Sequence, residues 1–323
     1  MAMAAAPTDT RAPARWQDFL QLLKPRVMSL VVFTGATGLV ASGHPINPIL
    51  GAVAVLCIAV GAGASGALNM WYDADIDGMM RRTRGRPVPA GRVQGADAAG
   101  LGVVLSLFSV MVMGMATNWL AAGLLAFTIV FYAVVYTMWL KRSTTQNIVI
   151  GGLAGALPPV IGWAAATGHA PLNAWLLCAI IFMWTPPHFW ALSLYTSEDY
   201  ARAGVPMMPV VKGAASTRRQ ILAYTCLLVP LGVLPAFTGL GGAAYLGVSS
   251  LGGLVFLLLA VRLFRSRAGE SPDPRMTDGL YDVKAGAKDA RNLFAFSILY
   301  VTLLFATLLV EHLAGLPVVE WFK

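Results

Sequence analysis

Apolar segments long enough to cross a lipid bilayer dominate this chain, and polar connections separate them. A helix that spans the hydrocarbon core needs about 17–25 mostly apolar residues. Nine segments meet that length, at roughly 27–43, 47–70, 96–115, 119–140, 147–167, 171–194, 219–239, 243–264 and 292–313. They predict transmembrane helices, because backbone groups in lipid must be satisfied internally and the segments lack the alternation of barrel strands.

The composition supports a membrane protein. Only 12% of the residues are charged and the mean hydropathy is +0.69, whereas soluble domains carry about 25% charged residues. We therefore predict an all-α, polytopic bundle of nine transmembrane helices. A disordered tail is expected at residues 1–20 and one transmembrane domain at 21–323. The tail lacks the apolar core of a signal peptide, and the three cysteines lie in separate apolar segments, which predicts free thiols.

Basic residues distinguish the two ends of the predicted bundle. Every lysine and arginine except Lys323 lies before the first segment or in connections that emerge on one side. By the positive-inside rule that side is cytoplasmic, so we expect a cytoplasmic N-terminus and a periplasmic C-terminus in a bacterial inner membrane. The net charge of +8 then reflects topology, and no nucleic-acid partner is expected. The longest connections on this side are 71–95, 195–218 and 265–291; the third is expected to be a flexible linker.

The connection after the second apolar segment carries the most informative polar residues. Asn69, Asp73 and Asp77 recur at intervals of four, so a helix would place them on one face and Asp75 roughly opposite. Mg²⁺ usually takes one or two protein carboxylates and completes its shell with water and phosphate oxygens. Four arginines follow, and guanidinium forks bind phosphates. The alternative is a solvated loop with balanced charges, but the helical spacing at the end of a span favours a site.

At these positions the chain resembles the intramembrane prenyltransferases related to 4-hydroxybenzoate polyprenyltransferase, and among them the protoheme IX farnesyltransferase (heme O synthase) family. The motif N-x-x-x-D-x-x-x-D matches Asn69, Asp73 and Asp77. The heme-specific extension matches Asp75, Asp77, Met80, Arg82, Thr83, Arg86 and Pro87. An element in the second long connection matches Asp199, Tyr200, Ala203, Gly204, Pro206, Met207 and Pro209. Lys24-Pro25-Arg26 and the stretch from Trp184 to Trp190 also match, and the resemblance covers about residues 20–315.

The resemblance implies transfer of a farnesyl group from farnesyl diphosphate to a vinyl group of heme B, with water adding a hydroxyl group, to give heme O. It implies Mg²⁺ as cofactor, held by Asp73, Asp77 and Asn69. Many relatives carry D-x-x-x-D in the second loop as well, but here Ala203 stands four residues after Asp199. A second ion would therefore have only Asp199 and its neighbour Glu198. The bilayer is the expected environment, and a heme A synthase is the downstream partner by analogy alone.

The remaining site residues follow from the same resemblance. Arg82 and Arg86 are expected at the diphosphate, with Lys24, Arg26 and Lys212 in support, and Asp75 and Thr83 belong to the substrate-binding motif. Tyr200 is one of several aromatic residues that could face an allylic cation; packing at the membrane interface is the alternative. His188 is a candidate heme contact, or it could satisfy carbonyls freed by a helix break at Pro186-Pro187.

Two other classes of protein remain open at this point. A sister intramembrane prenyltransferase could act on a quinone precursor or a chlorophyll-type acceptor, although the contexts of Arg82, Asp199 and His188 favour heme. A membrane transporter would also be a many-span bundle with polar residues at depth. The carboxylates here gather instead in a cytoplasmic connection, which favours the enzyme.

Overall fold

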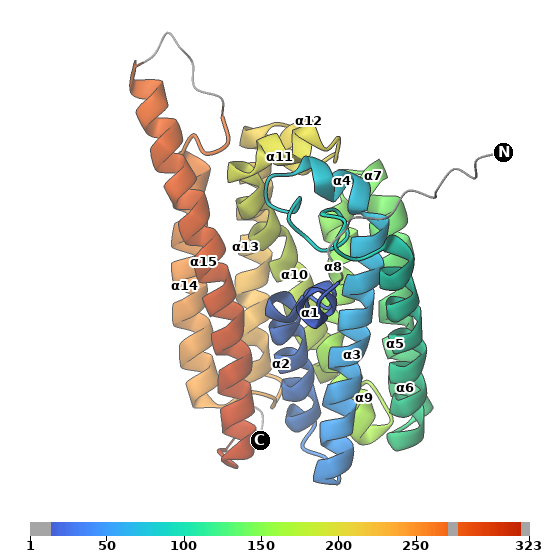
Figure 1. Ribbon diagram of the computed structural model, residues 1–323. Coiled ribbons are helices and arrows are strands. Elements are labelled where there is room, and N and C mark those ends of the chain that lie inside the picture. The colour runs from blue at the N-terminus through green and yellow to red at the C-terminus, as the bar shows by residue number, and fades with distance from the viewer. Residues whose placement is uncertain (1–13, 271–276, 318–323) are drawn as a thin grey trace, which may run out of the picture.

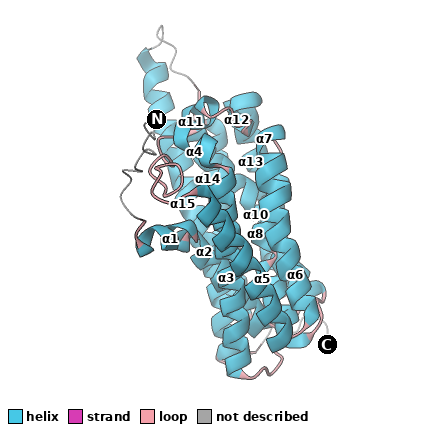
Figure 2. Ribbon diagram, turned by 45° about the vertical axis from the view of Figure 1, so that its right-hand side comes forward, coloured by secondary structure: helices cyan, strands magenta, loops and turns pink. Residues whose placement is uncertain are grey.

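The computed structural model describes residues 14–270 and 277–317, with side chains described for 14–270 and 286–317. Its regular elements are all helices, and the long ones run side by side as a bundle (Figures 1 and 2). The long elements are α2 (Pro25–Ala41), α3 (Pro48–Tyr72), α5 (Gly95–Ala116), α6 (Trp119–Val130), α8 (Asn147–Ala156), α9 (Pro158–Thr167), α10 (Leu172–Tyr195), α13 (Ala214–Val233), α14 (Ala243–Arg265) and α15 (Thr277–Leu313).

Eight of the described helical spans are long and apolar enough to cross a membrane. The ninth is a bent pair in which α1 (Trp16–Leu22) meets α2 at 52°. One span consists of α6, a π-helical stretch η1 (Phe131–Leu140) and α7 (Lys141–Ser143), and another joins α8 to α9 across Leu157, where Pro158 and Pro159 start a new helix. The predicted all-α bundle is confirmed, and the count of nine holds when the bent pair is one span.

The expected disordered tail is wrong at its inner end. Residues 1–13 lie outside the described residues, but the helix α1 already includes residues 16–20 of the segment that we expected to be disordered. The side chain of Asp18 accepts a hydrogen bond from the backbone N–H of Arg15 and pairs with Arg92 at 2.7 Å. Leu22 is fully buried against Ala67 and Met70 of α3. These contacts with a distant part of the chain hold α1 in place, and no local pattern reveals them.

The helices close into a ring in which α10 links α8 to α13. Along the ring α2 packs against α3, α3 against α5, α5 against α6 and α13 against α14, while α15 returns to contact α2. The helix α10 packs against α8, α13 and α15. Most residues in the apolar part of α10, and in that of the span formed by α8 and α9, are buried. The outward faces of α5 and α14 carry exposed leucines, valines and phenylalanines, as lipid contact requires.

Short helices gather at one end of the bundle, which we call the loop end. They are α4 (Ala74–Met79), α7, α11 (Ser197–Arg202) and α12 (Met208–Val211), seen together at the top of Figure 1. A second, smaller apolar cluster joins the first two long connections there; its members are Ile76, Met80, Ile148, Tyr200, Ala203, Val205 and Met207. The two connections that carry the sequence motifs are therefore packed against each other.

The third long connection is ordered at its start. Buried Arg218 on α13 donates to the carbonyl of Ala268 at 2.6 Å and pairs with Glu270 at 2.6 Å. The expected linker therefore begins no earlier than residue 271; residues 271–276 lie outside the described residues.

Candidate functional site

A buried polar line forms where α3 ends and α4 begins. Asn69, Asp73 and Asp77 are 3%, 0% and 1% exposed. The amide of Asn69 donates to Asp73 Oδ2 at 2.7 Å, and the backbone N–H of Asp77 donates to the carbonyl of Asp73 at 2.8 Å. The helical register thus continues through Asp73, although α3 ends at Tyr72. The predicted common face of these three residues is confirmed.

Asp75 lies on the other side of this turn, as the spacing predicted. Its carboxylate is 60% exposed and accepts two hydrogen bonds from Arg142, at 2.7 and 2.8 Å. The guanidinium of Arg142 also lies 4.8 Å from the centre of the Tyr72 ring. The hydrogen bond from Arg142 holds the pKa of the Asp75 carboxyl below its usual value. Asp75 therefore ties α4 to α7.

Four cations surround the buried line, and one of them is Arg142, whose terminal nitrogen lies 3.6 Å from Asp73 Oδ1. Lys24 donates to Asn69 Oδ1, Lys141 pairs with Asp73 Oδ2, and Arg86 pairs with Asp77 Oδ2 at 2.5 Å. Lys24 has φ of +49°, the left-handed region that L-residues seldom adopt, and no other described non-glycine residue has a positive φ. This conformation at the break between α1 and α2 turns the lysine toward α3. Buried carboxylates need such partners, because an unpaired buried charge is costly.

Sequence reasoning missed Lys141 as a site residue. It counted there only as a basic charge at the end of the fourth apolar segment. The structure brings it to Asp73 together with Thr137, whose hydroxyl accepts a hydrogen bond from Asn69 at 3.0 Å. Thr137 lies in η1 and Lys141 directly follows its last residue, and π-helical turns often mark functional positions. A threonine four residues before a lysine at the end of a span was the available signal, and it is a weak one.

The other predicted residues of the first loop fall into two groups. Thr83 is buried and its hydroxyl donates to the carbonyl of Asp77 at 2.8 Å, so it shapes the loop around the acid. Arg26 and Arg82 are exposed, as is Lys212 in the second loop. Within the described residues, the structure brings no acidic partner to these three side-chain charges.

The second loop reaches the first through Asp199 and Tyr200. The Asp199 carboxylate accepts a long hydrogen bond from the backbone N–H of Arg81 at 3.4 Å and pairs with Arg202 at 3.4 Å. Tyr200 is 8% exposed and packs in the apolar cluster with Ile76 and Met80. Both residues therefore lie at the junction of the two loops.

His188 is held inside the bundle by aromatic rings and a hydroxyl group. Its ring stacks between Trp184 at 4.3 Å and Phe294 at 4.5 Å, and Nδ1 lies 2.6 Å from the hydroxyl of Ser297 on α15. The expected helix break is wrong, because α10 continues through Pro186 and Pro187. His188 is thus bonded to a neighbouring helix and not to a freed carbonyl. Its other ring nitrogen has no partner among the described residues.

The acids of the buried line fit a hard cation. The second oxygen of each carboxylate, Oδ1 of Asp73 and Oδ1 of Asp77, is buried without a hydrogen-bond partner among the described residues. Buried polar atoms without partners are rare in folded proteins, and carboxylate oxygens suit Mg²⁺. The side chains described at 14–270 and 286–317 form no cluster of three or more His, Cys, Asp or Glu that could hold a metal. Asp199 therefore does not join Asp73 and Asp77 in one cluster.

Comparison with known sequences gives consistent results. The profile of the UbiA prenyltransferase family matches residues 30–280. A protein named protoheme IX farnesyltransferase from Caulobacter sp. (strain K31) is 73% identical, covering 97% of this chain and 95% of that protein. A protein of the same name from Maricaulis maris (strain MCS10) is 59% identical, covering 96% and 95%.

Comparison with solved structures supports the same fold. A structure from work on digeranylgeranylglyceryl phosphate synthase matches with a TM-score of 0.72 at 14% identity, covering 92% of this chain and 98% of that chain. A UbiA homolog from Archaeoglobus fulgidus, bound to DMAPP and Mg²⁺, matches with a TM-score of 0.66 at 14% identity, covering 88% and 99%. At this identity the likeness establishes the arrangement of helices.

Proposed function

The chain belongs to the UbiA prenyltransferase family and, within it, to the protoheme IX farnesyltransferases, and on that premise we propose that it transfers the farnesyl group of farnesyl diphosphate to a vinyl group of heme B. In this reaction the allylic carbon–oxygen bond breaks and diphosphate leaves. The allylic carbon then bonds to the terminal vinyl carbon, water supplies a hydroxyl group to the inner vinyl carbon, and a proton is released. The product is heme O.

The observation that carries this proposal is the pairing of buried acids with cations at the loop end. Lys24, Lys141 and Arg86 contact the line formed by Asn69, Asp73 and Asp77. The breaking bond leaves negative charge on the diphosphate, so groups that bind this charge more tightly in the transition state lower the barrier. Arg86 can bind phosphate oxygens through a forked pair of hydrogen bonds, and exposed Arg82 can approach from the loop surface.

Asp73, Asp77 and Asn69 would hold Mg²⁺, with Asp199 available to a second ion across the junction of the loops. When bound, the ion supplies charge stabilisation for the departing diphosphate. In its absence Lys141 and Arg142 pair with Asp73 and Arg86 pairs with Asp77, which keeps the buried line from carrying uncompensated charge. The homolog with DMAPP and Mg²⁺ supports a metal requirement at the level of the family.

The acceptor side is assigned to α10. His188 lies in a ring-lined part of the bundle with one nitrogen held by Ser297, so its orientation is set in advance. A neutral imidazole can contact heme iron or accept a hydrogen bond near a propionate. Tyr200, at the junction of the loops, is assigned to the wall that faces the allylic cation.

The proposed location is a bacterial inner membrane with the loop end in the cytoplasm. The support is the gathering of basic residues in the connections of that end, by the positive-inside rule. The N-terminus would then be cytoplasmic and the C-terminus periplasmic.

The proposed reaction is tested by its product. The chain is expressed in a bacterial host that lacks a heme O synthase, and the hemes extracted from its membranes are analysed by mass spectrometry. We expect heme B to be joined by a species heavier by one farnesyl group and one hydroxyl group. Membranes that contain the folded protein and only heme B would refute the heme acceptor, and a prenylated quinone precursor would favour a sister enzyme.

The proposed metal is tested separately. Membranes stripped with EDTA should lose turnover, and added Mg²⁺ should restore it, because the carboxylates alone repel the diphosphate that they are proposed to bind through the ion. Membranes of the same host without the expressed chain are the control, since they form no prenylated heme. Full turnover after stripping, without added metal, would contradict the proposal.

A further inference from the structure

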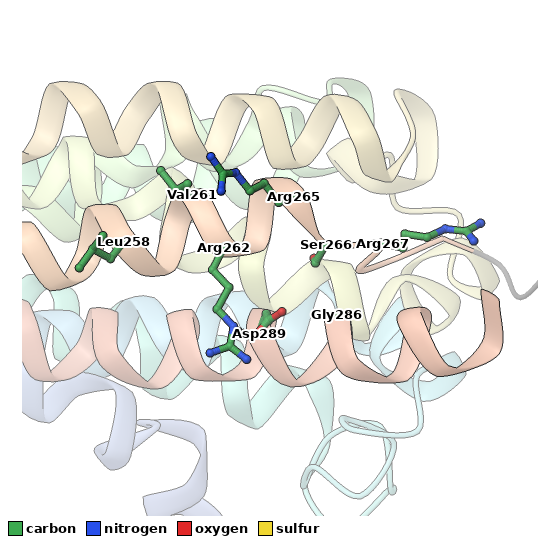
Figure 3. A pocket seen from close by; sticks show the side chains of 8 residues that line it. All are labelled: Leu258, Val261, Arg262, Arg265, Ser266, Arg267, Gly286 and Asp289. Atoms are coloured by element: carbon green, nitrogen blue, oxygen red, sulfur yellow. Dashed lines mark ion pairs between the residues drawn. The ribbon is translucent and has the colours of Figure 1, made fainter. Parts of the chain in front are cut away.

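A pocket of about 530 Å³ opens between α14 and α15 at the loop end. Its lining residues are Leu258, Val261, Arg262, Arg265, Ser266, Arg267, Gly286 and Asp289 (Figure 3). None of them belongs to the candidate prenyltransferase site. The lining contains three arginines and one carboxylate, so its net charge favours an anion.

The pocket exists because the chain after α14 crosses α15 at a glycine. A Cβ added to Gly286 would lie 2.5 Å from the backbone nitrogen of Ala268. The segment from Ser266 to Ala268 can therefore approach α15 closely, while Arg218 binds the carbonyl of Ala268 from the other side. The base of the pocket is held by backbone contacts and does not depend on the long arginine side chains.

Two arginines have hydrogen-bond donors to spare. Arg262 reaches across from α14 and pairs through Nε with Asp289 Oδ1 at 2.7 Å, yet its side chain is 67% exposed (Figure 3). Its two terminal amino groups remain available. Arg265, three residues further along α14, is exposed and has no acidic partner among the described residues. Arg267 is already bound to Glu270 at 2.8 Å. We therefore assign the anion to Arg262, beside Asp289, and to the exposed side chain of Arg265, which must turn toward it from the opposite side of α14 (Figure 3).

The outward face of α14 changes from apolar to basic at this pocket. Leu251, Leu254 and Leu258 are 69%, 53% and 59% exposed, as expected for side chains in contact with acyl chains. Arg262 follows Leu258 by four residues, one helical turn toward the loop end. An anion that sits beside exposed leucines at the end of a transmembrane helix is most simply the headgroup of a lipid, because basic pockets between such helices bind anionic headgroups.

We propose that this pocket binds the phosphate group of an anionic phospholipid from the leaflet at the loop end. Arg262 and Arg265 bind the phosphate oxygens, and Leu258 and Val261 contact the first part of the acyl chains. Asp289 holds Arg262 in place and at the same time weakens binding by its own charge. The proposal is independent of the reaction that the enzyme carries out.

The test is a lipid titration of the full-length protein in detergent, after delipidation, followed by native mass spectrometry. Phosphatidylglycerol and zwitterionic phosphatidylcholine are the two probes. We expect phosphatidylglycerol to bind the natural protein more tightly, and Arg262→Ala with Arg265→Ala to weaken it by about tenfold. Phosphatidylcholine binding should be unchanged. The matched control is Arg219→Ala, which removes an exposed arginine from the loop end of α13 and should leave both affinities within about twofold.

A second variant should change the phosphatidylglycerol affinity in the opposite direction, without loss of the folded structure. Asp289→Asn should strengthen phosphatidylglycerol binding severalfold, since the competing charge is removed, whereas Asp97→Asn, an exposed acid at the start of α5, should not. Equal phosphatidylglycerol affinity in the natural protein and in the variant with Arg262→Ala and Arg265→Ala would overturn the proposal. The two arginines would then contribute only to the orientation in the membrane and to the C-terminal end of α14. If millimolar inorganic phosphate displaces phosphatidylglycerol from the same arginines, the pocket binds free phosphate, and the assignment to a lipid headgroup is overturned.

Discussion

At the scale of the residue, burial separates three neighbouring aspartates into two kinds. Asp73 and Asp77 are buried, and each retains an oxygen without a hydrogen-bond partner among the described residues, whereas Asp75 is exposed and accepts two hydrogen bonds from Arg142. The same residue type thus has different chemistry at positions two residues apart. The difference follows from the helical turn, which directs alternate members of the motif to opposite sides.

We therefore predict that Asp73→Asn and Asp77→Asn reduce turnover by roughly 10²–10³, the usual effect of losing one transition-state electrostatic contact. Asp75→Asn should be milder, because it removes an exposed ion pair of small energetic worth. Heme O formation in membranes with equal protein content measures all three. A loss for Asp75→Asn as deep as that for Asp73→Asn would discard the argument from the helical face, while leaving the metal proposal standing.

His188 and Arg86 should affect different substrates. We predict that His188→Ala raises the KM for heme and leaves that for farnesyl diphosphate nearly unchanged, while Arg86→Ala does the reverse because a forked phosphate contact is lost. Assays that vary one substrate at a time measure both constants.

The stacking of His188 between Trp184 and Phe294 requires a matched variant. His188→Phe keeps an aromatic ring in that stack and removes both nitrogens, so it should show the same rise in KM for heme without the loss of packing. If His188→Ala is defective and His188→Phe is normal with heme, the histidine has only a structural role beside Ser297.

At the scale of the element, glycine sets how closely two helices approach. A Cβ added to Gly162 of α9 would lie 2.0 Å from the carbonyl oxygen of Gly35 on α2, and one added to Gly38 would lie 2.1 Å from the carbonyl oxygen of Pro159. The obstacles are backbone atoms, so no rotamer change relieves them. Small residues at such crossings are the usual means of packing helices in membranes.

Gly162→Ala should therefore destabilise the folded protein by about 1–3 kcal/mol, the usual cost of overpacking. Gly155→Ala on α8 is the control, because an added Cβ meets nothing within 4 Å there; it should be neutral or slightly stabilising, since alanine favours helix. Thermal unfolding of the purified proteins in detergent compares them. Equal melting temperatures would show that α2 and α9 can separate without cost.

At the scale of the whole molecule, the fold brings the two motif-bearing loops together at one end. The apolar cluster around Tyr200 and the contact of Asp199 with the backbone of Arg81 join elements that are more than a hundred residues apart in the chain. A site between two loops can bind one substrate from both sides, which a single loop cannot do.

The topology predicts that loops 71–95, 195–218 and 265–291 all face the cytoplasm. Single cysteines at exposed Arg84, Lys212 and Arg265 should resist a membrane-impermeant thiol reagent added to whole cells, whereas cysteines at His169 and Thr238 should react. The exposed thiol of Cys226 must first be replaced, while Cys57 and Cys178 are buried. Reaction from outside at any one of the three loop positions would refute the topology.

Local pattern was sufficient to predict the spans and the orientation of the first motif. The apolar segments define the spans because only a helix satisfies its own backbone in lipid, and a spacing of four residues places Asn69, Asp73 and Asp77 on one face. A resemblance at the motif residues indicated the family. Each of these inferences depends on residues close together in the chain, where the geometry of the helix is known in advance.

Contacts between distant segments were decided only by the tertiary structure. Lys24 reaches Asn69 and Lys141 reaches Asp73 from other parts of the bundle, and neither pairing has a sequence signature because any basic residue at a span end satisfies the positive-inside rule. The continuous α10 at Pro186 and Pro187, and the hydroxyl group of Ser297 beside His188, depend likewise on the packing of neighbouring helices. Sequence by itself therefore determined the elements and the chemistry of the first motif, while the fold determined which charges meet, since long-range pairing depends on how whole helices pack.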